Sequence, residues 1–187
     1  RQMCIRDRLG SRKSQTYSNF NDFMYNLSYW SSWSNGFNIW KSEFDKIDKN
    51  LKLNKLFPHT SLFLTQHQAK LFCINDNLLF DVQRIPKRGG HNKFEAFTIE
   101  YPSLLDECCK KGHISTKCKK HILFGIMVQF LPSLLFNKYI IRIETFDDTG
   151  FRDNLKKYYP SYAYWLVLIS VLGVPFRLFC RKLKNKR

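Results

Sequence analysis

The sequence is short of acidic residues and of glycine. Asp and Glu supply only 15 of its 187 residues against 31 Lys and Arg, which gives a formal net charge of +16. A charge of this size is typical of chains that bind nucleic acid or an anionic membrane surface. Only eight glycines are present, and none forms a phosphate-cradling loop. Gly89 and Gly90, directly after Lys87 and Arg88, indicate a turn instead.

Catalytic motifs and repeats are also missing. None of the histidines has a Ser or Cys nucleophile and a carboxylate at a recognisable spacing. The five are His59, His67, His91, His113 and His121. No internal repeat is visible at a usual period. We therefore expect no enzymatic activity and no cofactor. The 44% of apolar residues, including 17 phenylalanines, are enough for a packed core and argue against global disorder.

The first residues do not read as part of a fold. Met3 to Arg8 resembles a translated adaptor end from a sequencing library, so residues 1–8 are interpreted as a scar and set aside. We then expect the true N-terminus, with any upstream membrane span, to be missing.

A long apolar run lies near the C-terminus. Ten of the fifteen residues from Trp165 to Phe179 are Leu, Ile, Val or Phe. As one helix, residues 162–180 would extend about 28 Å, close to the thickness of a bilayer core. The flanks agree, because aromatic residues precede the run and the basic tail 181–187 follows it. We predict a transmembrane helix here, with Tyr162, Trp165, Pro175 and Arg177 as anchor residues and Arg177 snorkelling to the interface. The alternative is a buried core helix.

A second apolar run, residues 122–136, is shorter, at about 22 Å as a helix. It contains Gln129 and Pro132. A run of this length is often a core element or a re-entrant segment, and a second span is the alternative.

One group of side chains has the character of metal ligands. Thiolates and imidazoles suit zinc, which needs four ligands in a tetrahedron. The group is Cys108, Cys109, His113, Cys118 and His121. The two adjacent cysteines lack the usual two-residue gap, so the group is only a weak candidate and we expect no metal. The alternatives are palmitoylated or reduced cysteines beside a membrane segment, or a disulfide with Cys73.

Local patterns predict an α+β extramembrane domain over residues 9–160. A short helix or a turn is expected at Glu43 to Lys49, a turn at Asp147 to Gly150, and a helix from Phe151 to Tyr159 that Pro160 ends. β-Branched and aromatic residues or period-two alternation predict strands elsewhere. These segments are Tyr25–Trp30, Thr60–Thr65, Leu78–Ile85, Phe94–Tyr101 and residues 139–145.

Two surface features complete the reading of this domain. Asn26-Leu27-Ser28 is a glycosylation sequon, which makes Asn26 a candidate acceptor. Trp30, Trp33 and Trp40 are expected to pack on the domain, with an interfacial aromatic belt as the alternative.

Short motifs in two blocks match one known family in their order. The C-terminal block holds Phe146-Asp147-Asp148, Gly150-Phe151-Arg152, Trp165 and Val174-Pro175-Phe176-Arg177. The upstream block holds Tyr29-Trp30-Ser31-Ser32-Trp33, Leu51 to Leu56, and Pro58-His59-Thr60 through Leu64. Together they resemble the transmembrane protein 151 family over about 100 residues. The resemblance implies a multi-pass membrane protein with an α+β domain before its last span, and it implies no catalytic residues. Residues 87–137 do not fit and are interpreted as an insertion or a misassembled stretch.

The sequence thus predicts a fragment of an integral membrane protein. Its expected partners are the lipid bilayer and other membrane proteins, in a protein–protein or membrane-organising role. The alternative is a soluble basic protein that binds nucleic acid. We disfavour it because the two clusters of basic residues, one within 110–120 and one within 181–187, each adjoin an apolar run. A third hypothesis is a small zinc module.

Overall fold

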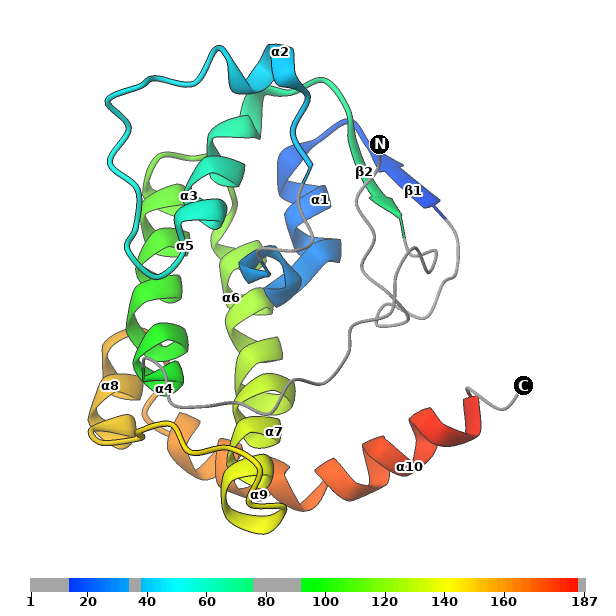
Figure 1. Cartoon of the computed structure of the whole chain (residues 1–187), viewed down its shortest axis with the longest axis vertical. Coiled ribbons are helices and arrows are strands. Elements are labelled where there is room, and N and C mark those ends of the chain that lie inside the picture. Colours follow the sequence, from blue (N-terminus) through cyan, green and yellow to red (C-terminus); the bar gives the residue numbers. More distant parts are fainter. Residues whose placement is uncertain (1–13, 34–37, 76–91, 185–187) are drawn as a thin grey trace. The chain divides into compact units, whose positions relative to one another are not determined.

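The chain is mostly helical, with one small sheet (Figure 1). The computed structural model describes residues 14–33, 38–75 and 92–184, without the side chains of 181–184. The two strands pair antiparallel, so α+β holds only loosely as the fold class. The expected scar at residues 1–8, the strand at Leu78–Ile85 and the loop at residues 86–90 lie outside the described residues.

Two compact units alternate along the chain. Unit 1 consists of residues 1–84 and 103–122, and unit 2 of residues 85–102 and 123–187. Each is described by itself below.

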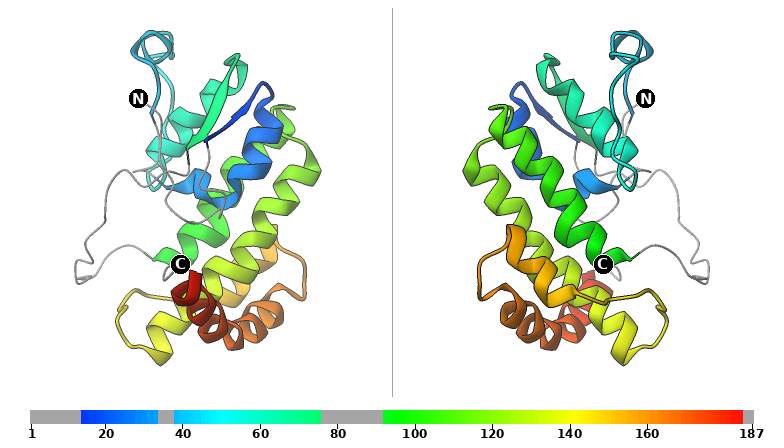
Figure 2. Two further views of the ribbon diagram at one scale, coloured as in Figure 1. Left: turned by 90° about the vertical axis from the view of Figure 1, so that its right-hand side faces the viewer. Right: turned by 90° about the vertical axis from the view of Figure 1, so that its left-hand side faces the viewer.

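The sheet of unit 1 joins two distant segments. Strand β1 (Ser14–Tyr17) pairs with β2 (Phe72–Asn75), with Ser14 opposite Asn75 and Tyr17 opposite Phe72. Both views of Figure 2 show the two strands side by side. A two-stranded sheet is marginal in water and needs a covering element. Helix α1 (Phe20–Leu27) supplies it.

Helix α1 begins at an N-cap that the sequence encodes. The Asn19 side chain accepts a hydrogen bond from the backbone N–H of Asp22 at 3.1 Å. The buried residues then follow the spacing of one helical face: Phe20, Phe23, Met24 and Leu27. The strand expected at Tyr25–Trp30 is therefore wrong. That segment forms the end of α1 and the 3₁₀ helix η1 (Ser28–Ser32), because the cap and the buried face outweigh the strand propensity of its aromatic residues.

Aromatic rings fill the core of unit 1. The ring of Phe23 stacks on Phe72 of β2 at 5.0 Å between centroids, and Phe20 lies 5.4 Å from the same ring. Phe63 contacts both α1 phenylalanines, at 6.0 and 5.7 Å. Offset aromatic pairs of this kind add to the energy of burial.

Phe63 belongs to a helix, not to the strand expected at Thr60–Thr65. Helix α3 (Pro58–Leu64) begins with proline at its first turn, where the missing N–H costs nothing. Two side chains fix its start: Asn54 accepts from the N–H groups of Leu56 and Phe57, and Ser61 Oγ accepts from Asn54 N at 3.0 Å. The 3₁₀ helix η3 (Thr65–Gln68) continues α3.

The tryptophans divide between packed and exposed positions. Trp30 and Trp33 are half-buried and their rings lie 5.5 Å apart. Trp40, at the start of α2 (Lys41–Phe44), keeps 72% of its surface exposed, so its expected packing is wrong. Helix α2 is shorter than the helix expected within Glu43 to Lys49.

Helices α5 (Tyr101–Lys110) and α6 (Thr116–Gly125) meet at a turn containing Gly112, whose φ is +75°. The turn is tied to α1, because Asn21 Oδ1 accepts from the N–H of Ser115 at 2.7 Å. Ser115 Oγ in turn caps α6 by accepting from Cys118 N. Asp106 pairs with Lys119 at 2.7 Å, which links the two helices.

In unit 2, the segment Phe94–Tyr101 was expected to be a strand. It forms the first turns of a helical segment instead. Asn92 caps α4 (Lys93–Glu95) by accepting from Glu95 N, and the π-helical turn η4 (Ala96–Glu100) leads into α5. Because the cap fixes helical geometry, Phe94 enters the core and its ring lies 4.4 Å from Phe151.

The apolar run 122–136 lies within one helix, Thr116–Ile140. It consists of α6, the π turn η5 (Ile126–Phe130), α7 (Leu131–Leu135) and the π turn η6 (Phe136–Ile140). The strand expected at residues 139–145 is wrong. Arg142 has a φ of +61°, and the N–H groups of Ile141 and Ile143 bond back to Phe136 and Asn137, so this segment closes the helix end.

The turn and helix expected after residue 146 are confirmed. Gly150 has a φ of +73°, which favours glycine, and helix α8 (Phe151–Tyr158) follows it and ends before Pro160. The single helix expected over residues 162–180 is broken instead. Helices α9 (Ala163–Leu172) and α10 (Val174–Lys184) meet at Gly173 with a bend of 49° (Figure 1). Pro175 has no N–H for the carbonyl four residues before it, which accounts for the break.

Tyr159 provides a test of the core of unit 2. Its hydroxyl donates to the carbonyl of Phe97 at 2.7 Å, and burial raises the pKa of this phenol well above its usual value. Tyr159→Phe removes this buried hydrogen bond, so we expect a loss of about 1–2 kcal/mol in the free energy of unfolding. Tyr162→Phe is the control, because Tyr162 is 59% exposed. Thermal unfolding followed by circular dichroism measures both, and equal stability of the two variants would contradict the prediction.

Candidate functional site

An apolar stripe covers one side of α9 and α10. Its residues keep between 58% and 80% of their surface exposed, although each is large and apolar. They are Trp165, Ile169, Leu172, Phe176 and Phe179. Their separations alternate between four and three residues, which places them on one side of a helix. We call this set the apolar stripe.

The opposite side of the same helices faces the core of unit 2. Ala163 and Val167 of α9 and Val174 of α10 are buried. No Asp, Glu, Lys or Arg occurs from residue 163 to residue 176. Helix α9 and the start of α10 therefore lack the polar outer face that a surface helix of a water-soluble domain normally carries.

The predicted anchor residues differ in their exposure to solvent. Tyr162 and Trp165 are exposed, as an interfacial belt requires, and Pro175 is exposed beside the bend. Tyr159, which the sequence placed near that belt, is buried in the core.

Arg177 is the anchor residue whose placement differs from the prediction. Its guanidinium turns toward the protein, donating to the carbonyl of Val128 in η5 and to that of Ser170 in α9, the latter at 3.2 Å. In an α-helix, Val128 would accept from residue 132, which is a proline without an N–H. Arg177 thus joins the irregular stretch of helix Thr116–Ile140 to the α9–α10 break.

Helix Thr116–Ile140 is, among the described residues, the one helix long and apolar enough to cross a bilayer. Its most apolar stretch is 56% buried within the protein, and a core helix of a soluble protein can have the same length and composition. Helices α9 and α10 meet the same criterion only as a bent pair.

The histidines of the weak metal candidate stack on other rings. His113 lies on His67 with 3.5 Å between centroids, and His121 lies on Tyr25 at 4.0 Å. Within the described part of the chain, no three His, Cys, Asp or Glu side chains form a group that could hold a metal ion.

The cysteines of that candidate differ in their exposure to solvent. Cys108 and Cys118 are buried, and burial raises the pKa of the Cys108 thiol to about 11, so it stays protonated at neutral pH. Cys109 is half-exposed, with its sulfur 3.7 Å from Thr116 Oγ1. All five described cysteines are free thiols, so the alternative of a disulfide with Cys73 is wrong.

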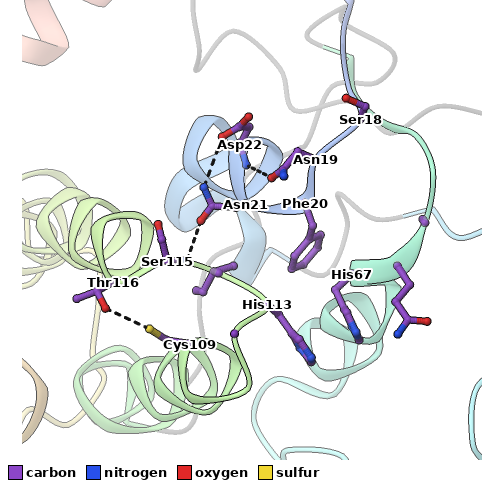
Figure 3. Close-up of a pocket in the computed structure, with 14 residues that line it drawn as sticks. Ser18, Asn19, Phe20, Asn21, Asp22, His67, Cys109, His113, Ser115 and Thr116 are labelled. Atoms are coloured by element: carbon purple, nitrogen blue, oxygen red, sulfur yellow. Dashed lines mark hydrogen bonds between the residues drawn. The ribbon is translucent and has the colours of Figure 1, made fainter.

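Unit 1 contains a polar hollow of about 850 Å³ (Figure 3). Its wall comes from the start of α1, the end of η3 and the α5–α6 turn, and includes Asn19, Asp22, His67, Cys109 and His113. The sequence did not indicate this hollow, because its residues come from three segments that only the fold brings together. Its open, polar lining offers hydrogen bonds but contains no arrangement of nucleophile, base and orienting group.

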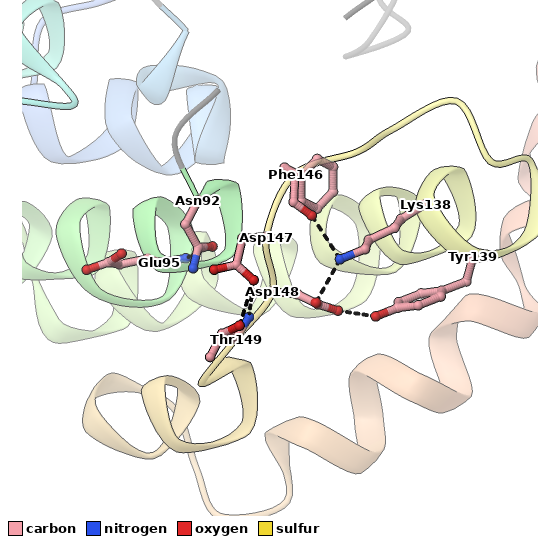
Figure 4. A network of polar contacts seen from close by, with 8 residues as sticks. All are labelled: Asn92, Glu95, Lys138, Tyr139, Phe146, Asp147, Asp148 and Thr149. Atoms are coloured by element: carbon pink, nitrogen blue, oxygen red, sulfur yellow. Dashed lines mark hydrogen bonds and ion pairs between the residues drawn. The ribbon is translucent and has the colours of Figure 1, made fainter. Parts of the chain in front are cut away.

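A polar network closes the loop that follows helix Thr116–Ile140 (Figure 4). Lys138 donates to Asp148 at 2.7 Å and to the carbonyl of Phe146 at 2.8 Å, and Tyr139 also bonds to Asp148. Burial opposes ionisation of Asp148, but the hydrogen bonds from Lys138 and Tyr139 outweigh it and lower its pKa. These residues position the loop, since each is engaged by another residue of unit 2.

The glycosylation candidate is accessible on α1. Asn26 is exposed, and its side-chain nitrogen donates to the carbonyl of Asp22 at 2.8 Å. An attached glycan would replace this bond without entering the core.

Comparisons with known proteins return no relative. No family model matches the sequence, no curated protein matches it, and no solved structure matches the fold.

The stacked histidines give the hollow a pH dependence. Burial, then the neighbouring His67 and Lys111, lower the pKa of His113 in the folded protein. Its contribution to stability is therefore complete above the unfolded pKa of about 6.5 and is lost as the pH falls through the lower folded value. We expect His113→Gln to weaken the acid dependence of the unfolding temperature between pH 7.5 and pH 5, which are about the limits of histidine titration. An unchanged dependence would assign the effect to other groups.

The hydrogen bond from Arg177 to Val128 can be tested by combining a substitution of Arg177 with one of Pro132. We expect Arg177→Gln to lower the free energy of unfolding by about 1–3 kcal/mol, because a charged donor to two carbonyls is lost. In the Pro132→Ala background the same change should cost less, since an N–H at residue 132 can serve Val128. A double-mutant cycle by thermal unfolding in detergent measures this coupling. Strict additivity would mean that Val128 does not depend on Arg177.

Proposed function

We propose that this chain is a non-enzymatic domain of an integral membrane protein. In this proposal the lipid bilayer contacts the apolar stripe of α9 and α10, and helix Thr116–Ile140 is embedded with it. The role that follows is membrane anchoring and organisation of other membrane proteins.

The observation that carries the proposal is the apolar stripe. Five large apolar side chains lie exposed along one side of two helices whose opposite side is already packed. In water such a surface would be a strong aggregation hazard, whereas in lipid it needs no polar cover. Tyr162 before the stripe, Trp165 at its start and the basic residues after it match the two ends of a membrane-embedded segment.

The lysines at the end of α5 and in α6 bear on the nucleic-acid alternative. Three of them are held by acidic neighbours within unit 1: Lys110 and Lys119 by Asp106, and Lys111 by Glu107. Engaged lysines offer less to a phosphate backbone than a continuous basic groove would. This favours the membrane over nucleic acid as the partner.

The family resemblance points the same way and stays a prediction. Of its motifs, Gly150-Phe151-Arg152 forms the start of α8, and Pro175-Phe176-Arg177 forms the start of α10. The first motif precedes the α9–α10 segment in the chain, and the second lies within it.

Alkaline carbonate extraction of membranes tests the proposal with matched variants. We expect the full chain to remain in the membrane pellet. The test variant carries Ile169→Glu, Leu172→Glu, Phe176→Glu and Phe179→Glu, and it should be released at least in large part, because charges on the lipid-facing side oppose insertion.

The control variant carries the same change at exposed apolar residues of unit 1: Trp40→Glu, Phe44→Glu, Leu53→Glu and Leu71→Glu. It should stay in the pellet like the unaltered chain. Release of the unaltered chain by carbonate would refute the proposal and bring the soluble nucleic-acid-binding alternative forward.

A further inference from the structure

We propose that α10 lies in the plane of the membrane interface and binds anionic phospholipid, rather than continuing α9 across the bilayer. This inference rests on the proposed function and assigns one surface of the domain to one class of lipid.

The bend between the two helices is the first reason. Helix α9 alone, with its ten residues, extends about 15 Å, which is half of a bilayer core. A crossing would have to be completed by α10, but α10 departs from the direction of α9 by 49°, so the pair reaches less far across a bilayer than a straight helix of the same length. The break is built in, because Pro175 has no N–H to continue the helical hydrogen bonds and Arg177 donates to the carbonyl of Ser170 just before the break.

The distribution of charge is the second reason. The chain has no charged residue from residue 163 to residue 176, and its character changes abruptly in α10. Phe176, Leu178 and Phe179 are exposed apolar residues there. Basic residues follow at once in the sequence, at Arg181, Lys182, Lys184, Lys186 and Arg187. A helix that combines exposed phenylalanines with basic residues is typical of segments that lie at the headgroup level of anionic membranes.

The surroundings of Arg177 are the third reason. In a straight span over residues 162–180, this side chain would be released to snorkel toward headgroups. Here its guanidinium is engaged by the carbonyls of Val128 and Ser170. In this proposal the positive charge that the sequence places after Cys180 attracts anionic headgroups, and Phe176 and Phe179 contact acyl chains.

Fluorescence of the full chain in lipid vesicles tests this arrangement. An environment-sensitive fluorescent amino acid is placed at Phe176 or Phe179, and the chain is reconstituted in phosphatidylcholine vesicles with or without phosphatidylserine. We expect the increase in emission on burial to be about threefold larger with the anionic lipid, and to fall in high salt.

Two variants, each with three basic residues changed to glutamate, test which charges cause the dependence on phosphatidylserine. Arg181→Glu, Lys182→Glu and Lys184→Glu together should abolish the dependence on phosphatidylserine. Lys52→Glu, Lys55→Glu and Lys70→Glu, which change three exposed lysines of unit 1, should leave it intact.

The outcomes separate this inference from the proposed function. Equal, salt-independent burial in both kinds of vesicle would overturn the inference, since a bilayer-crossing α9–α10 does not depend on lipid charge. The proposed function would then stand. A chain that does not float with vesicles and that carbonate releases would remove the proposed function itself.

Discussion

Two prolines within apolar helices, and the arginine that links the two helices, determine how unit 2 is built. Pro132 and Pro175 each remove an N–H from an apolar helix, and a carbonyl left unsatisfied in an apolar environment costs several kcal/mol. Arg177 donates to the carbonyl of Val128, whose α-helical donor would be residue 132, and to that of Ser170 beside the α9–α10 break. Because one side chain serves both helices, the place of the bend is fixed. The bend in turn decides which side of α9 and α10 is buried and which forms the apolar stripe.

The sequence predicted those elements whose signals are local and unambiguous. The turn at Asp147–Gly150 and the helix that follows it depend on a left-handed glycine and on Pro160, and both are read directly from residue type. The apolar character of both long runs was also visible. The sequence did not show which run forms the longer continuous helix. The run at residues 122–136 is extended on both sides by segments that contain polar residues, and together they form the helix Thr116–Ile140.

Three of the expected strands failed for one shared reason. Aromatic and β-branched residues raise strand propensity, but Asn19, Asn92 and the Asn54–Ser61 pair cap or fix helix starts at these places. Such caps depend on single polar side chains and are easily overlooked beside a run of apolar residues. The polar hollow and the contacts of Arg177 could not be predicted, because their residues are dozens of positions apart along the chain.

The alternation of the two units has a consequence for how the chain is made. Unit 1 needs residues 103–122, and Asn21 finds its partner Ser115 only 94 residues later. A ribosome therefore releases the last piece of unit 1 immediately before the apolar stretch that starts at Ile122. Closure of unit 1 and the emergence of the long apolar helix Thr116–Ile140 therefore coincide during synthesis. A pause in translation at this point would leave β1 and α1 waiting for their partners, with their phenylalanines exposed to chaperones.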